Sequence, residues 1–165
     1  MPSVSPRRMI LSNYETGEYM EVQFNPSSVT IELEAFYNRL KVAGQSHEEL
    51  QYANTSNTRV SFELIWDALA SAAPDLLNVD SFLMHLHHPP QNVASVSSGA
   101  PAPVLFSWPN WIAMLCASPK LKIVTTRWDA DGTPTYQRIS VELEERRTRR
   151  LGAEVVRRVG LLRAA

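Results

Sequence analysis

Three stretches of the chain alternate between apolar and polar side chains with a period of two residues. They are residues 28–33, 59–66 and 138–144, and the first directly follows the phrase Phe24-Asn25-Pro26. This period is typical of β-strands that have one buried face and one solvated face. Strands of this kind belong to antiparallel sheets rather than to parallel sheets buried on both sides. The pattern therefore predicts an antiparallel β protein.

The polar faces of these three strands are mostly acidic. One hypothesis is that they line a channel, in which weak negative charge keeps a polyanion from adhering. The alternative, an ordinary solvated sheet face, stays open. The channel-lining candidates are Thr30, Glu32, Glu34, Ser61, Glu63, Ser140, Glu142 and Glu144. We expect the apolar faces to pack on a helix.

Shorter signals predict the remaining strands. Residues 8–13 and 18–24 flank a polar turn with Gly17, which indicates an opening hairpin. Residues 35–58 have weak periodicity and contain Gly44, so they read as a long loop. A loop of this length is typically an interaction arm, although a surface excursion without a role stays open. Further strands are expected at residues 104–108, 111–116, 121–128 and 135–145.

One core helix is predicted at residues 75–87. Pro74 and Asp75 suit a helix start, and Pro89-Pro90 ends it. Its apolar stripe consists of Leu76, Val79, Phe82, Leu83 and Leu86. About seven strands and one helix favour an antiparallel β-sandwich or barrel with the helix packed against it.

The chain of 165 residues divides into a β-domain, residues 1–145, and a basic tail, residues 146–165. The tail holds seven arginines and one glutamate, whereas the rest of the chain has nine basic and sixteen acidic side chains. Apolar residues recur in the tail at helical spacing, which predicts an amphipathic helix. Because this helix would carry many arginines, we expect it to dock on an acidic neighbour. The alternative, a frayed terminus, stays open. The candidate contact residues are Arg146, Arg147, Arg149, Arg150, Leu151, Val155, Arg157, Arg158, Val159 and Leu162.

Catalytic and metal-binding signals are weak. His85, His87 and His88 lie close in sequence but have no supporting acid, so we expect no metal site there. The turn from Asp129 to Pro134 is interpreted as a hairpin rather than a calcium loop. Cys116 stands in an apolar run and is expected to be a buried hydrophobe. We therefore expect neither an enzyme nor a cofactor, and with no apolar run of membrane length, no membrane.

The order of these features resembles a known family. The elements are Phe24-Asn25-Pro26, Ser61-Phe62-Glu63-Leu64-Ile65-Trp66-Asp67, Val104-Leu105-Phe106-Ser107-Trp108, Asp131-Gly132-Thr133-Pro134 and Ile139-Ser140-Val141-Glu142-Leu143-Glu144-Glu145. Together they resemble the amino-terminal domain of contractile injection system tube proteins, from phage tails and phage-tail-like particles. The resemblance covers roughly residues 9–145.

The resemblance implies a tail-tube fold that assembles as a ring, most simply a homohexamer, in the baseplate of a contractile tail. The expected function is structural: a hub or tube-initiator ring that joins the spike to the tail tube, in contact with wedge proteins. DNA or other cargo would pass through its lumen. In this family a LysM module often follows; here a basic tail follows residue 145 instead. A bulk tail-tube subunit and a nucleic-acid-binding β-domain are the alternatives.

Overall fold

The computed structural model describes residues 7–41, 43–44, 46–70, 75–88 and 100–146. Seven strands of this part form one antiparallel sheet in the order β2-β1-β7-β8-β9-β6-β3, and β4 and β5 pair separately. The elements are β1 (Ile10–Asn13), β2 (Tyr19–Glu21), β3 (Val29–Glu32), β4 (Ala35–Leu40), β5 (Glu49–Thr55), β6 (Arg59–Asp67), α1 (Leu76–His87), β7 (Val104–Trp108), β8 (Ile112–Trp128) and β9 (Pro134–Glu145). The predicted antiparallel, mainly β fold with one helix is confirmed.

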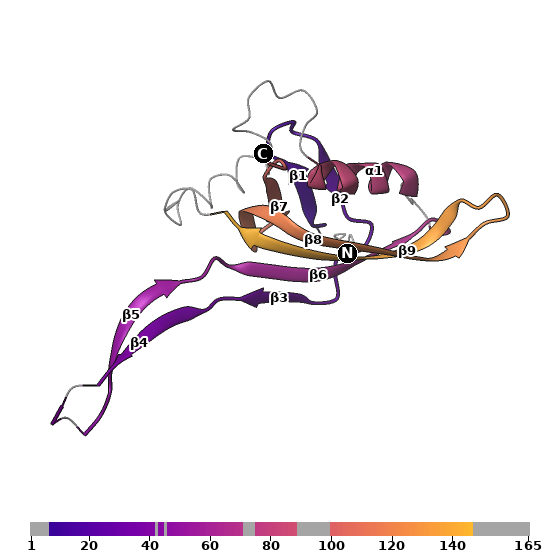
Figure 1. Ribbon diagram of the computed structural model, residues 1–165. Coiled ribbons are helices and arrows are strands. Elements are labelled where there is room, and N and C mark those ends of the chain that lie inside the picture. The colour runs from indigo at the N-terminus through magenta and orange to yellow at the C-terminus, as the bar shows by residue number, and fades with distance from the viewer. Residues whose placement is uncertain (1–6, 42, 45, 71–74, 89–99, 147–165) are drawn as a thin grey trace, which may run out of the picture.

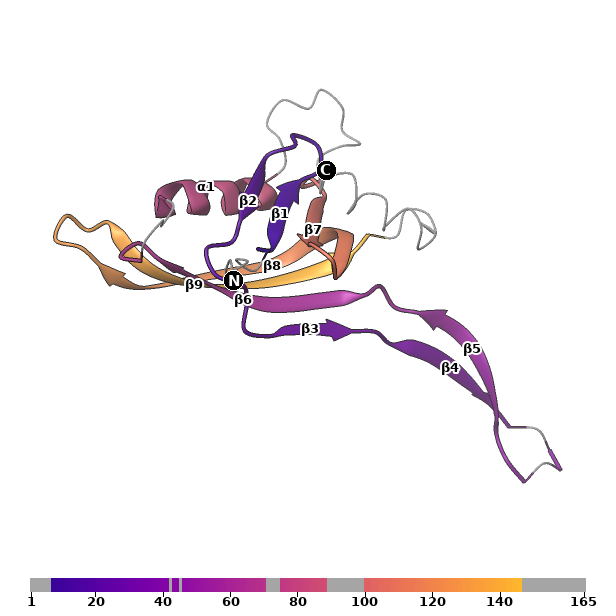
Figure 2. The same cartoon turned by 180° about the vertical axis from the view of Figure 1, so that it is seen from behind.

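The sheet bends so that its two parts face each other. Figures 1 and 2 show β3, β6, β9 and β8 as one elongated layer, with β1, β2, β7 and α1 all on the same side of it. The layer therefore has an inner face, which those elements cover, and an outer face. Helix α1 covers only part of the inner face, because β1, β2 and β7 cover the rest.

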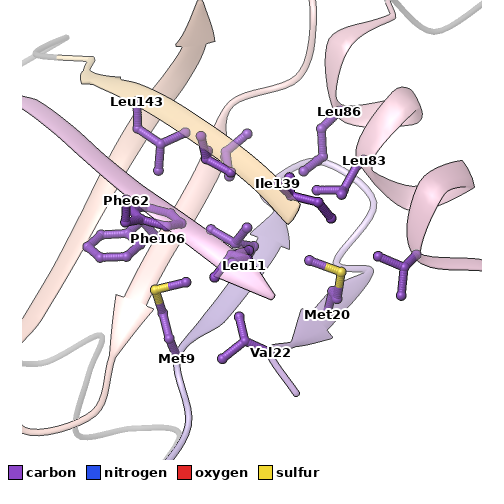
Figure 3. Close-up of a cluster of buried hydrophobic side chains, with 14 of the residues drawn as sticks. Met9, Leu11, Met20, Val22, Phe62, Leu83, Leu86, Phe106, Ile139 and Leu143 are labelled. Carbon is purple, nitrogen blue, oxygen red and sulfur yellow. The ribbon is translucent and has the colours of Figure 1, made fainter. Parts of the chain in front are cut away.

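The core fills the space between the layer and the elements that cover it (Figure 3). Phe62 of β6 and Phe106 of β7 stack with ring centroids 5.4 Å apart, so the two parts of the sheet meet there. Leu11 and Val22 contribute from the opening hairpin, and Leu143 contributes from β9. Burial of these side chains supplies the main stabilising free energy, at about 25 cal/mol per Å² of apolar surface.

Strand β8 corrects one prediction. Residues 111–116 and 121–128 do not form two strands but one, which spans Ile112–Trp128. The register with β9 shifts between Ala117 and Lys120, where Pro119 lies. Proline cannot donate to the ladder, but a local irregularity lets the strand continue past it. The first part of β8 pairs with β7 and the rest pairs with β9 alone, so this strand connects the two parts of the sheet.

Helix α1 forms as its apolar stripe predicts. Asp75 caps the helix, because its side chain accepts a hydrogen bond from the amide of Leu77. The residues buried against the core are Leu76, Val79, Leu83 and Leu86, with Phe82 partly buried. The stripe fixes which side of the helix faces the sheet.

Both predicted tight turns are confirmed. In the β1–β2 turn, Gly17 has φ +75°, and the Asn13 side chain accepts hydrogen bonds from the amides of Glu15 and Thr16. In the β8–β9 turn, Gly132 has φ +81°, and Asp129 Oδ1 accepts from the amides of Asp131 and Thr133. A carboxylate used in this way shapes a turn, in keeping with the hairpin interpretation.

The segment predicted as a long loop is instead mostly a β-hairpin. β4 and β5 pair from Ala35↔Thr55 to Leu40↔Glu49 and extend beyond one end of the layer (Figure 1). Every residue of both strands is exposed. The alternating pattern of a strand arises when one face is buried, so a hairpin exposed on both faces leaves no such signal. We call residues 35–55 the arm.

Candidate assembly surfaces

The polar side chains predicted on three strands do share one face. Residues that are directly opposite in an antiparallel pair point to the same side of the sheet. The registers place Thr30 opposite Ser61, Ser61 opposite Glu142, and Glu142 opposite Lys120. A second row joins Glu32, Arg59 and Glu144, and a third joins Glu63, Ser140 and Lys122. These rows form the outer face of the layer.

The polar faces of β3, β6 and β9 are mostly acidic, but the outer face as a whole is not, because β8 lies on the same face. The three alternating stretches already contain Arg59 and Arg138, and β8 adds three further cations, Lys120, Lys122 and Arg127. The acidic residues on this face are Glu32, Glu63, Asp67, Glu142 and Glu144, and the basic residues are Arg59, Lys120, Lys122, Arg127 and Arg138. The face therefore carries equal numbers of opposite charges. Lys120 and Lys122 are two residues apart, and this spacing indicates that both lie on the same face of a strand.

Three ion pairs cross between strands on the outer face. They join Arg59 Nε to Glu144 Oε2 at 3.6 Å, Lys120 Nζ to Glu142 Oε1 at 3.2 Å, and Arg127 Nη2 to Asp67 Oδ1 at 2.7 Å. The Arg127 guanidinium also lies 5.3 Å from the centroid of the Tyr136 ring. All of these groups are at least partly exposed, so each pair contributes at most about 1 kcal/mol. Their main effect is to keep the field above the face weak.

Two residues at the end of β3 depart from the predicted alternation. β3 ends at Glu32, and the next residue, Leu33, is 63% exposed rather than packed in the core. Glu34 lies beyond the ladder at the base of the arm, where its carbonyl accepts from the amide of Ser56 at 2.8 Å. Glu34 is thus a rim residue of the outer face and not a member of its rows.

The four-stranded layer ends in edges on both sides. β3 is the last strand of the sheet and, among the described strands, pairs only with β6. On the other side, residues 120–128 of β8 pair with β9, and the pairing of β8 with β7 is limited to residues 112–116 of β8. Within the described residues, no strand pairs with the outward side of residues 120–128. Unpaired edges of this kind bind further strands readily, and native proteins cover, charge or pair them.

The arm exposes large apolar side chains that no sequence pattern predicted. Tyr37 and Tyr52 are directly opposite each other and contact edge-to-face, with centroids 5.7 Å apart. The exposed apolar residues of the arm are Phe36, Tyr37, Leu40, Leu50 and Tyr52. A two-stranded hairpin has no core of its own, so such residues are typical of a surface that a partner covers.

The helix carboxyl end and β8 border an open hollow of about 420 Å³. Met84, Leu121 and Ile123 form its apolar lining, and His87, His88 and Lys120 complete it. His87 Nε2 lies 3.1 Å from Ser118 Oγ, and burial lowers the pKa of His87. No group of three metal-ligating side chains converges in the part of the chain that the structure describes.

Cys116 is buried at the start of the β8–β9 ladder. Burial, reinforced by the Glu145 carboxylate, raises the pKa of the Cys116 thiol to about 12. The thiol therefore stays protonated at neutral pH, in agreement with its interpretation as a small hydrophobe. No helix among the described residues has the length and apolar character needed to cross a membrane.

Of the predicted contact residues of the basic tail, the described part of the chain includes Arg146. Arg146 is exposed, and its amide donates to the carbonyl of Leu115 at 2.8 Å. The other predicted contact residues, from Arg147 to Leu162, lie outside the described residues.

Comparison with known proteins gives a family match and several similar solved structures. The family model described as "Contractile injection system tube protein" matches residues 8–154. A solved structure described as "Cryo-EM structure of the anti-feeding prophage (AFP) baseplate, 6-fold symmetrised" has a chain with 16% identity and a TM-score of 0.40. The similarity covers 88% of this chain and 93% of that chain. No curated protein matches.

Proposed function

The chain belongs to the contractile injection system tube protein family, and we propose that it assembles head to tail into a ring whose lumen is lined by the outer face of the layer. It is a structural component of an injection system. The observation that carries the proposal is the four-stranded layer, which combines a solvated outer face with an unpaired edge on each side.

The strand directions support closure of the ring. Each neighbouring pair in the series β8, β9, β6, β3 is antiparallel, so β8 and β3 run in opposite directions. In a ring with its axis roughly along the strands, rotation keeps the direction of each strand. The β3 edge of one copy then meets the β8 edge of the next in antiparallel orientation, which a continuous ladder requires. Each copy thereby covers the edges of its neighbours.

The outer face suits a lumen wall. Its opposite charges are equal in number and partly paired across strands, so the wall attracts neither a polyanion nor a polycation strongly. The candidate lining residues keep this role in the proposal: Thr30, Glu32, Ser61, Glu63, Ser140, Glu142 and Glu144 on the face, with Glu34 at its rim. Either DNA or protein cargo could pass such a wall without adhering.

The arm supplies contact along the ring axis. It extends beyond one end of the layer, in the direction of the strands (Figure 2). A ring would therefore present a circle of arms with exposed Phe36, Tyr37 and Leu50 toward the next component of the tail. Burial of these side chains is worth roughly 1.5–3 kcal/mol each, enough to fasten successive components.

Within the particle, we assign the chain to a hub or tube-initiator ring that connects the spike to the tail tube. The basic tail supports this assignment, since its net positive charge would have to be neutralised in every ring of a long tube. A bulk tube subunit is the second candidate, which the edges and lumen face fit equally well. A nucleic-acid-binding domain is disfavoured, because equal numbers of carboxylates and cations on the outer face offer no net attraction for phosphates.

Cryo-electron microscopy of the intact particle tests the proposal. We expect one ring of this chain between spike and tube, with the outer face toward the lumen and the arms toward a neighbouring component. Stacked rings along the whole tube would favour the bulk-subunit alternative. A ring in which Glu63 and Ser140 are packed in a dry interface would refute the lumen assignment.

A further inference from the structure

Resting on the proposed ring, we infer that Glu32 of one copy forms an ion pair with Lys122 of the next copy, and that this pair fixes the register of the ring interface. The two residues lie on the two edge strands, β3 and β8, and both are exposed on the outer face. Glu32 is an anion at the β3 border of the outer face, and Lys122 is a cation at the β8 border.

Neither charge has an ion-pair partner within 4 Å among the described residues of the copy; Arg59, which lies opposite Glu32, pairs with Glu144 instead. Lys120, Arg59 and Arg127 each have a carboxylate within 4 Å on the same layer. Arg138 hydrogen-bonds to Tyr136 and interacts with Glu63, and both effects raise the pKa of Arg138. Among the described residues, Lys122 forms no ion pair, and neither does Glu32. One unpaired cation thus remains on the β8 edge and one unpaired anion on the β3 edge.

The antiparallel register that joins these two residues also matches their neighbours. If Glu32 lies opposite Lys122, then Thr30 lies opposite Val124, and the rim residue Glu34, just beyond the end of β3, comes level with Lys120. On the inner side, the same register puts Leu33 opposite Leu121 and Ile31 opposite Ile123. Opposite charges therefore meet in the lumen, and apolar side chains meet on the side of the core.

The apolar residues that this register brings together lie beside the open hollow next to α1. Leu121 and Ile123 line the open hollow beside α1, together with the half-exposed Met84. Leu33 is 63% exposed in the single copy, and insertion into the neighbour's hollow would bury it. Covering an exposed leucine contributes roughly 1.5–3 kcal/mol, more than the ion pair itself.

The register also has the stagger that a closed barrel requires. Within one copy, Thr30 is level with Lys120 through Ser61 and Glu142. A ring without stagger would therefore put Glu32 level with Ser118 of the next copy. Pairing with Lys122 displaces neighbouring copies by about four residues, roughly 13 Å along the strands. Tilted strands in closed barrels need a displacement of this kind.

Charge reversal with a charge swap tests the pair. Glu32→Lys and Lys122→Glu should each raise the concentration at which half of the chain is in rings by roughly tenfold, because attraction becomes repulsion at every interface. The double variant that carries both changes should return this concentration close to the wild-type value. Mass photometry measures the ring fraction, and circular dichroism checks that each variant folds. Glu63→Lys is the matched control, because Glu63 lies in the middle of the layer.

A cysteine cross-link provides an independent measurement. Glu32→Cys combined with Lys122→Cys should give disulfide-linked oligomers up to the full ring, since opposite residues in a ladder lie within disulfide distance. The matched pair Glu32→Cys with Thr126→Cys, displaced along β8, should cross-link poorly. If the wild-type chain forms no ring, the proposed function fails. If rings form but the swap does not recover assembly or the displaced pair cross-links better, the Glu32–Lys122 contact is wrong and the ring stands.

Discussion

Gln137 Nε2 donates a hydrogen bond to Asp80 Oδ2 over 2.9 Å, and this contact joins strand β9 to helix α1. Gln137 is 1% exposed, and it also lies 3.3 Å from Thr125 Oγ1. The apolar stripe of α1 sets which side of the helix faces the sheet, and this hydrogen bond holds the helix at one position along the sheet.

Replacement of Gln137 by leucine should lower the free energy of unfolding by about 1–3 kcal/mol, because a buried carboxylate oxygen of Asp80 loses its donor. Urea denaturation followed by circular dichroism measures the change. Gln51→Leu on the exposed arm is the matched control and should change stability by less than about 0.5 kcal/mol. Additive effects of Gln137→Leu and Asp80→Ala in a double-mutant cycle would show that the two side chains do not interact.

Phe62→Ala should lower the free energy of unfolding by about 3–5 kcal/mol, since it removes one ring of the stacked pair with Phe106 and leaves a cavity. Phe36→Ala removes the same atoms from the exposed arm. It should leave the stability of the single copy within about 0.5 kcal/mol of wild type but weaken assembly. Comparable destabilisation by the two changes would mean that the arm packs on the domain.

Removal of the arm should separate folding from assembly. A variant in which Ala35 and Thr55 are joined by Asn-Gly keeps β3, β6 and the base contact between Glu34 and Ser56. We expect native circular dichroism and an unchanged unfolding midpoint, together with loss of attachment to neighbouring tail components.

Hydrogen exchange provides the second readout for the arm. Amides of β4 and β5 should exchange quickly in the free subunit and slowly in the assembled particle, because a two-stranded hairpin is marginal alone. Strong and equal protection in both states would contradict the assignment of residues 35–55 as an assembly arm.

The Cys116 thiol should make stability depend on alkaline pH. Its pKa is about 12 in the folded chain against an ordinary value of 9.0, so the folded state keeps the proton between these values while the unfolded state loses it. The stabilising contribution is complete below pH 9 and falls as the pH rises, by up to about 1.4 kcal/mol per unit. Cys116→Ala should lose less stability than wild type between about pH 8 and about pH 10.5. Equal losses would indicate that the thiol is solvated.

Deletion of residues 146–165 should leave the β-domain folded but weaken its incorporation into particles. The segment carries seven arginines, so its contact should weaken as salt screens their charge. Incorporation of the wild-type chain should therefore fall at high ionic strength. Incorporation of the truncated chain should be low at every ionic strength. Particle yield and the amount of this chain per particle measure the effect. Normal incorporation of the truncated chain would exclude the tail as an attachment element.

Residue types alone predict the elements that bury one face. Val60, Phe62 and Leu64 alternate with polar residues because only one side of β6 meets the core. The alternation can therefore be recognised from the residue types. The stripe of α1 and the glycine turns at Gly17 and Gly132 were predictable for the same reason: helix burial and positive φ both restrict which residues fit.

Three other features depend on contacts between segments far apart in the chain. The arm left no periodic signal because neither of its faces is buried, and β8 looked like two strands because Pro119 interrupts a ladder that resumes beyond it. The charge balance of the outer face depends on the strand order, which puts Lys120 and Lys122 of β8 beside the acidic residues of β9. Strand order and register are set by packing between residues far apart in the chain, and no local pattern contains that information.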